Sequence, residues 1–167
     1  MSNSVLRLLP LSADAFEPFG DVIQVADHNQ VIPINYGLTE RHHDLAAVDV
    51  EEAGGKAVIS IFRSKPVQLP FAVKIMERHP KGSQAFMPLG GNPYVVVVAP
   101  AGELDPSKIC AFLAQANQGV NYHKGTWHHY CLGLNSSNDF LVVDRGGEGS
   151  NCDEIELPEN LELYVNH

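Results

Sequence analysis

Two segments of this 167-residue chain concentrate the side chains that could perform chemistry, and the first spans residues 77–92. It opens with Glu77 and His79, two residues apart, and continues to Gln84. Side chains alternate along a β-strand, so Glu77 and His79 share one face if residues 71–79 are extended. The earlier residues of that face are apolar. We therefore expect a core-facing stripe that opens into a polar cavity.

The second segment, residues 119–129, contains three of the eight histidines. His123 and Lys124 precede a glycine, as residues of a turn do, and His128 and His129 follow on an expected strand. Consecutive strand residues point to opposite faces, so at most one of His128 and His129 looks into a given cavity.

The elements that must position these residues are short strands separated by turn signals. Ser12 is a suitable N-cap for a short helix over residues 13–16, before Pro18 and Gly20. The expected strands span 21–25, 43–50, 57–63, 71–78, 83–88, 94–99, 109–113, 120–122, 127–134 and 140–144. Frequent strands without intervening helices indicate an all-β sandwich or barrel. The run Val95–Val98 is apolar on both faces, which is typical of a central strand.

Composition and charge restrict the class of protein. A chain of this length, 44% hydrophobic, is expected to form one domain over residues 1–167. A net charge of −9 argues against nucleic-acid partners, because phosphate contacts need clustered Lys and Arg. We expect no membrane span and no signal peptide. Three widely spaced cysteines predict free thiols in a reducing cytoplasm.

The two segments resemble the two sequence motifs of the cupin superfamily, whose fold is an antiparallel jelly-roll barrel (a double-stranded β-helix). In the first motif the matching positions are Glu77, His79, Gln84 and Gly91. The second motif, Pro-x-Gly-x-x-His, matches residues 123–128, with His at the proline position. The ligand identities depart from the motif, because Glu replaces the first His and Gln replaces the usual Glu. His128 is the expected cavity residue, which leaves His129 for the surface or an interface.

The resemblance extends over nearly the whole chain to the ureidoglycolate lyase family. The blocks that carry it are residues 15–23, 59–63, 77–93, 121–129, 140–145 and 151–154. Membership implies a homodimeric carbon–nitrogen lyase that splits ureidoglycolate into glyoxylate and urea during allantoin breakdown. Two alternatives stay open at this point. The chain could be a metal-dependent cupin of another class, a sugar isomerase or a dioxygenase, or a non-catalytic cupin that binds a small ligand.

The cupin resemblance implies a metal site made of Glu77, His79, Gln84 and His128. Two oxygen and two nitrogen ligands suit nickel, manganese, iron or zinc, and the family association favours nickel. Glu77 is the one anion of the set, so a bound divalent ion leaves about one positive charge for a monoanionic substrate. We expect weak retention of the metal, because a neutral glutamine is a poor ligand. Gln84 could equally orient the substrate by hydrogen bonds.

Cleavage of ureidoglycolate requires a base for its hydroxyl proton and an acid for the departing urea nitrogen. The candidates for these roles are Glu77, His79, His123, Lys124 and His128. Arg63 and Arg145 are candidate cations for the substrate carboxylate. The sequence alone does not rank these groups.

Overall fold

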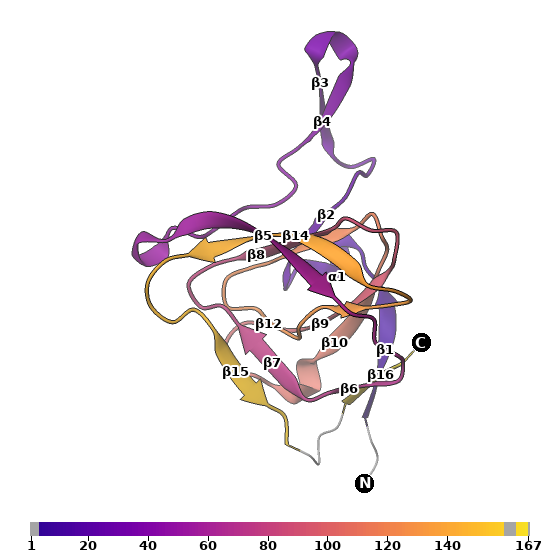
Figure 1. Ribbon diagram of the computed structural model, residues 1–167, viewed down its shortest axis with the longest axis vertical. Helices are drawn as coiled ribbons and strands as arrows, with labels where there is room; N and C mark the ends of the chain where they lie inside the picture. The colour runs from indigo at the N-terminus through magenta and orange to yellow at the C-terminus, as the bar shows by residue number, and fades with distance from the viewer. Residues whose placement is uncertain (1–3, 159–162, 167) are drawn as a thin grey trace.

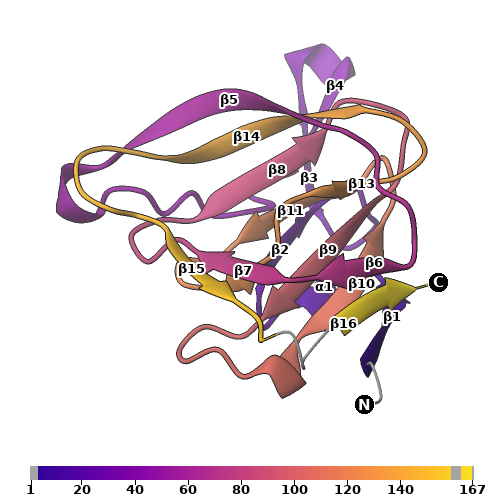
Figure 2. The same ribbon diagram turned by 60° about the horizontal axis from the view of Figure 1, so that its bottom comes forward.

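The computed structural model describes residues 4–158 and 163–166, and its strands form two main sheets and a separate hairpin (Figures 1 and 2). The nine-stranded sheet runs in the order β15-β7-β12-β9-β10-β1-β16-β6, with β13 also paired to β9. These strands are β1 (Ser4–Pro10), β6 (Phe71–Val73), β7 (Ile75–Arg78), β9 (Tyr94–Ala99), β10 (Cys110–Ala114), β12 (Trp127–His128), β13 (Leu132–Gly133), β15 (Asp153–Glu156) and β16 (Leu163–Asn166).

The five-stranded sheet is antiparallel throughout, in the order β2-β11-β8-β14-β5. Its strands are β2 (Gly20–Ile23), β5 (Lys56–Ser64), β8 (Gln84–Pro88), β11 (Gly119–Tyr122) and β14 (Asn138–Gly146). A separate hairpin of β3 (Gln30–Ile34) and β4 (Thr39–His43) projects away from the two sheets (Figure 1). The helical elements are α1 (Ala13–Phe16) and three 3₁₀ turns, η1 (Asn35–Gly37), η2 (Glu52–Gly54) and η3 (Pro106–Lys108). In the described residues no helix is long and apolar enough to cross a membrane.

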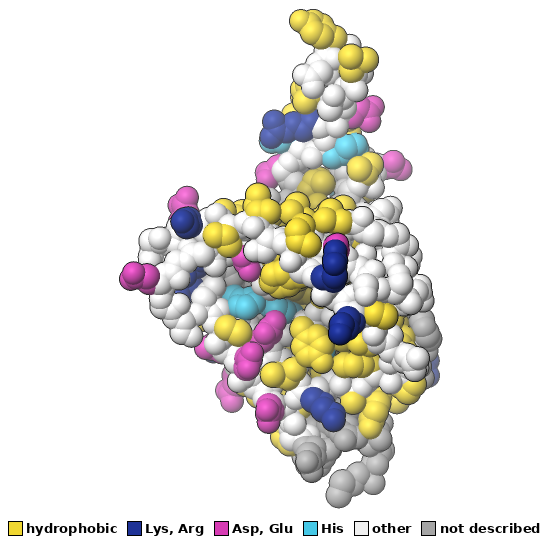
Figure 3. Space-filling model, viewed as in Figure 1, with side chains coloured by type: hydrophobic (Ala, Val, Ile, Leu, Met, Phe, Trp, Pro, Cys, Tyr) yellow, Lys and Arg dark blue, Asp and Glu magenta, His cyan; other side chains and the backbone are white. Residues whose placement is uncertain are grey.

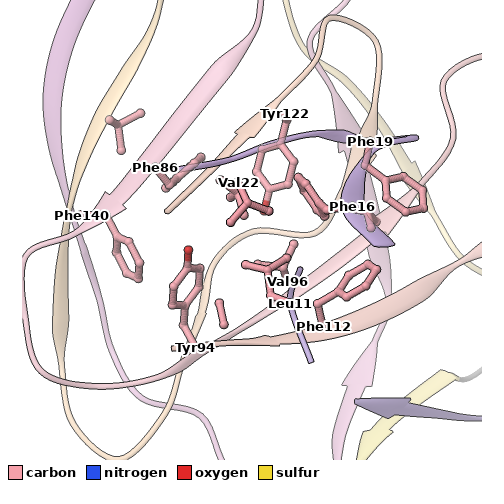
Figure 4. Close-up of a cluster of buried hydrophobic side chains, with 14 residues drawn as sticks. Leu11, Phe16, Phe19, Val22, Phe86, Tyr94, Val96, Phe112, Tyr122 and Phe140 are labelled. Atoms are coloured by element: carbon pink, nitrogen blue, oxygen red, sulfur yellow. The ribbon is translucent and has the colours of Figure 1, made fainter. Parts of the chain in front are cut away.

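The main core lies between the two sheets and is rich in aromatic side chains (Figure 4). Phe16 of α1 is fully buried, with ring centroids of Phe19 and Phe112 each 5.7 Å away. From the five-stranded sheet, Phe86 and Phe140 pack edge to face at 6.1 Å. Such pairs add to the hydrophobic gain from burying the rings. This core holds the two sheets together.

The nine-stranded sheet curls on itself around a second core. Strands β6 and β7 are separated only by Lys74, yet they stand near opposite ends of the sheet order. Trp127 and Met76 are almost fully buried in this second core. Strand β9 lies between both cores, and all its residues are buried because each face packs against one of them.

The all-β fold expected from the sequence is confirmed, and the helix over residues 13–16 and the strand over 94–99 match in their bounds. Ser12 caps the helix by accepting a hydrogen bond from the Ala15 backbone N–H. One departure from a purely antiparallel barrel is β1, which runs parallel to both β10 and β16.

The strand expected over residues 43–50 is wrong. Asp44 has a φ of 54°, which ends the extended conformation of β4. Side chains, rather than a strand ladder, hold the residues that follow: Asn121 donates to the Ala47 carbonyl, and Ser83 Oγ accepts from the Asp49 N–H. The sequence does not predict strands β1, β3, β4, β15 and β16, and the segments 71–78 and 127–134 each divide into two strands.

Candidate active site at the barrel mouth

The site begins with a cross-strand pair in the nine-stranded sheet. Glu77 on β7 lies directly opposite His128 on β12 in the antiparallel register. The distance between Glu77 Oε1 and His128 Nδ1 is 3.7 Å. His79 follows β7, and its ring centroid lies 5.1 Å from that of His128. One potential ligand atom from each of these residues lies within 4.8 Å of the other two, so the structure brings this expected triad together.

His79 is oriented by the loop that precedes β15. Its Nδ1 donates to the Asn151 carbonyl oxygen at 2.7 Å, so Nδ1 carries a proton. Asn151 is itself fixed, because its side-chain oxygen accepts from the Lys81 backbone N–H at 2.7 Å. A backbone carbonyl on one ring nitrogen directs the other nitrogen toward a ligand, as in many metal sites. Nε2 of His79 points to Gln84 Oε1, 3.1 Å away.

Gln84 reaches the triad from the five-stranded sheet, where it begins β8. Its side chain is buried, with 5% of the residue exposed. Its Nε2 donates to Asp144 Oδ2 at 3.0 Å, and Asp144 belongs to the neighbouring strand β14. The expected set of Glu77, His79, Gln84 and His128 therefore meets where the connection from β7 to β8 joins the two sheets.

His128 is buried and stacked. Its residue is 1% exposed, and the Tyr122 ring lies parallel to it at a centroid distance of 4.2 Å. Burial, and next the charge of His79, lower the pKa of His128 to about 3. The imidazole is therefore neutral near pH 7 and offers a lone pair. Its Nε2 is buried without a hydrogen-bond partner among the described residues.

Glu77 is half-buried, and burial raises its pKa above the ordinary value, while the charge of His79 opposes that rise. Its two oxygens face different neighbours. Oε1 faces His128, whereas Oε2 lies 3.8 Å from the Cys152 thiol, which donates to it. Cys152 and Glu154 form a second group with Glu77 that could hold a cation, on the exposed side of the same carboxylate.

A cavity of about 410 Å³ adjoins Glu77 and His128. The other lining residues are Phe62, Arg63, Ser64, Phe86, Tyr122, His129, Tyr130 and Cys131. In Figure 3 histidine side chains lie in a hollow of the visible face, beside acidic and apolar groups. The mixed apolar and polar lining of the cavity suits a small polar ligand.

The other expected site residues lie apart from this cluster or engage other partners. His123 Nε2 lies 3.1 Å from Asp21 Oδ2, and its side chain is about half exposed. Lys124 Nζ lies 2.7 Å from Glu52 and 3.5 Å from Asp49. His123 therefore pairs with a carboxylate of β2, and Lys124 pairs with carboxylates in and next to η2.

The two arginines differ in their access to the cavity. Arg63 lines it, and its Nε and Nη2 donate to Asp139 at 2.8 and 3.0 Å. Arg145 is buried and donates from Nε to the Glu52 carbonyl at 3.0 Å. Arg145 thereby ties β14 to η2.

The sequence did not predict three contacts of the site. These are the hydrogen bond between Gln84 and Asp144, the hydrogen bond between His79 and Asn151, and the stacking of Tyr122 on His128. Alternation along 140–144 could have placed Asp144 on the face opposite Arg145, but not against Gln84. The expectation that only one of His128 and His129 faces a given cavity is wrong, because both line this one. The surface position expected for His129 is also wrong. It is 2% exposed, donates from Nδ1 to the Tyr130 carbonyl, and packs edge to face on Phe71.

The donor set fits a divalent metal ion. Because Nδ1 of His79 donates to the Asn151 carbonyl, Nε2 is the ring nitrogen left for a metal, and it lies 3.1 Å from Gln84 Oε1, which offers lone pairs. Ligand atoms about 2.1 Å from one metal and at right angles are separated by about 3 Å. The unpartnered nitrogen of buried His128 and the Glu77 carboxylate complete a mixed nitrogen and oxygen set.

The two packed sheets form a cupin-like all-β barrel, and the cluster of Glu77, His79, Gln84 and His128 is its candidate metal-binding active site. The ureidoglycolate lyase family model matches residues 3–164, so the chain belongs to the ureidoglycolate lyase family. It is 56% identical over 158 residues to a ureidoglycolate lyase of Burkholderia mallei, covering 95% of this chain and 92% of the relative. A ureidoglycolate lyase of Pseudomonas syringae pv. tomato is 50% identical over 161 residues (96% and 94% covered), and one of Pseudomonas aeruginosa is 48% identical (96% and 95% covered).

Proposed function

We propose that this protein is an enzyme that cleaves ureidoglycolate to glyoxylate and urea. The observation that carries the proposal is the convergence of Glu77, His79 and His128 beside a cavity, in a chain of the ureidoglycolate lyase family. The cavity volume, about 410 Å³, is ample for a substrate of this size. Degradation of allantoin, a product of purine breakdown, is the corresponding pathway.

The reaction moves one proton and breaks one carbon–nitrogen bond. The substrate hydroxyl loses its proton, its oxygen forms the aldehyde C=O, and the electron pair of the C–N bond passes to the urea nitrogen. That nitrogen then takes up a proton. Among the described residues Glu77 is the one carboxylate that lines the cavity. We assign it the hydroxyl proton, which Oε2 accepts and then returns to the urea nitrogen.

The metal ligands we propose are Glu77 Oε1, His79, His128 and Gln84, with nickel as the ion and manganese, iron or zinc as substitutes. A divalent ion held by these residues would supply a positive charge that favours a carboxylate substrate and would lower the pKa of a nearby hydroxyl. Arg63 lines the cavity, and we propose that it attracts the substrate carboxylate. Phe62 and Phe86 also line the cavity, and we propose that their rings limit the access of water to the bound substrate.

The test follows glyoxylate, urea and ammonia together, using purified protein and racemic ureidoglycolate, with and without a chelator and added nickel. Glyoxylate and urea in equal amounts, without ammonia, are expected. His128→Ala is expected to abolish turnover, whereas His28→Ala, an exposed histidine outside the site, retains it. Ammonia in place of urea, or no product with any metal, contradicts the proposal. Oxygen uptake would instead indicate a dioxygenase.

We further propose that the protein is a homodimer and that it is cytoplasmic. The projecting β3–β4 hairpin supports a second copy, because Tyr36 and Leu38 at its tip are almost fully exposed. An isolated two-stranded hairpin is marginally stable in water. Ile59 and Ile61 of the edge strand β5 form a second exposed apolar surface on the same chain. Three free cysteines support a reducing compartment.

A further inference from the structure

The side-chain amide of Gln84 ends in an oxygen and an NH₂ group. The orientation of the amide decides which of the two faces the candidate metal site. Turned one way, Gln84 offers its oxygen to His79, and turned the other way it offers an NH₂ group that cannot bind a cation. Asp144 distinguishes the two orientations. Its carboxylate accepts hydrogen bonds, so Gln84 Nε2 must face Asp144 Oδ2, 3.0 Å away, and Oε1 must face His79.

We infer that Asp144 is a positioning residue, which fixes the Gln84 amide so that its oxygen is presented to the metal-binding triad. The inference deepens the proposed function and rests on it. Gln84 is buried, so its alternative orientation would leave the amide oxygen facing the Asp144 carboxylate, with no donor between the two acceptors. That mismatch is costly away from water. A single carboxylate on β14 therefore selects the useful orientation.

Asp144 also supplies a negative charge next to the proposed ligand set, which it contacts through Gln84. The cupin motif usually has a glutamate at the position of Gln84. A glutamate there would stand about 3 Å from the Asp144 carboxylate, and two like charges at that distance repel strongly. Gln84 and Asp144 together supply what one glutamate would supply at this position. Gln84 offers the ligand oxygen, and Asp144 provides the negative charge.

The neighbouring cations Arg145 and Lys124 bind other acceptors and not the Asp144 carboxylate. Arg145, adjacent to Asp144 in sequence, donates instead to the Glu52 and Glu148 carbonyl oxygens on the other side of the strand. Lys124 faces Glu52 and Asp49. The Asp144 carboxylate accepts instead from Gln84 Nε2.

The experiment is a double-mutant cycle that measures nickel affinity by calorimetry on metal-stripped protein. Asp144→Leu removes the acceptor and is expected to weaken nickel binding about 10- to 100-fold, as loss of such supporting hydrogen bonds typically does. Asp144→Asn retains an oxygen that accepts from Gln84 Nε2, so it should recover most of the affinity. In a Gln84→Leu background, Asp144→Leu should add nothing further. Asp27→Leu, at an exposed aspartate, is the matched control.

Two results overturn the inference. One is nickel affinity of Asp144→Leu equal to that of the wild type, and the other is an equal loss with and without Gln84. Thermal melting of each variant separates loss of the fold from loss of affinity. If the wild type binds no nickel, the metal part of the proposed function fails. The same cycle, measured in kcat and KM for ureidoglycolate, then decides whether Asp144 acts through Gln84.

Discussion

The rings of Tyr122 and His128 lie face to face, 4.2 Å between centroids and 3° from parallel. Tyr122 belongs to the aromatic core between the sheets, whereas His128 belongs to the candidate metal site. The core therefore sets the plane of a proposed ligand, and hydrophobic packing contributes directly to the geometry of the site.

Substitution of Tyr122 tests this coupling. Tyr122→Phe keeps the stacked ring and is expected to retain turnover, whereas Tyr122→Leu frees His128 to rotate and should lower kcat/KM about 10-fold or more. Steady-state kinetics and thermal melting measure both effects. Phe140→Leu, a core aromatic outside the site, should lower stability while kcat/KM is retained. Equal losses of activity in Tyr122→Leu and Phe140→Leu would contradict a specific role for the stack.

Glu77→Gln tests the proposed charge balance. The variant removes the one anion of the proposed ligand set, so we expect weaker nickel binding and loss of turnover with the fold preserved. Burial already raises the Glu77 pKa, so the neutral side chain should be accommodated without a large loss of stability. Metal content after dialysis and melting temperature are the measurements. Nickel retention equal to the wild type would remove Glu77 from the ligand set.

Lys124→Met distinguishes a structural lysine from a catalytic one. Lys124 is paired with Glu52, and this pair raises the lysine pKa. Exposed ion pairs contribute little to stability, and Lys124 is not among the residues that line the cavity. We therefore expect nearly unchanged kcat, KM and melting temperature. A large fall in kcat alone would restore Lys124 as a proton donor in the reaction.

The hairpin prediction concerns assembly. Serine at both Tyr36 and Leu38 should convert a dimer to a monomer, because it removes the most exposed apolar side chains of the hairpin. Light scattering on a sizing column gives the mass of each species. Leu89→Ser, at an exposed leucine away from the hairpin, should remain dimeric. A monomeric wild type would refute the dimer.

The three thiols should differ in reactivity. Burial raises the pKa of Cys110 to about 11 and that of Cys131 to about 12. Burial and the charge of Glu77 also raise the pKa of Cys152, but Cys152 is exposed and therefore accessible to a reagent. At pH 8 a thiol of pKa 11 or higher is ionised in about one molecule in a thousand or fewer. A disulfide reagent should therefore modify one thiol quickly in native protein and three after denaturation. Rapid modification of Cys131, identified by mass spectrometry, would contradict this.

The sequence alone determined the features that depend on neighbouring residues. The Ser12-capped helix, the central strand over 94–99 and the shared face of Glu77 and His79 follow from capping, apolar runs and alternation. Motif spacing indicated which residues could meet, and the triad with Gln84 does converge.

Only the tertiary structure decided the contacts made between distant strands. Register across the sheet sets Glu77 opposite His128, and the neighbouring β8 and β14 bring Asp144 to Gln84, 60 residues apart. The same long-range packing pairs Lys124 with Glu52. Alternation specifies the face of a side chain but not its partner, because the partner depends on how strands far apart in the chain align.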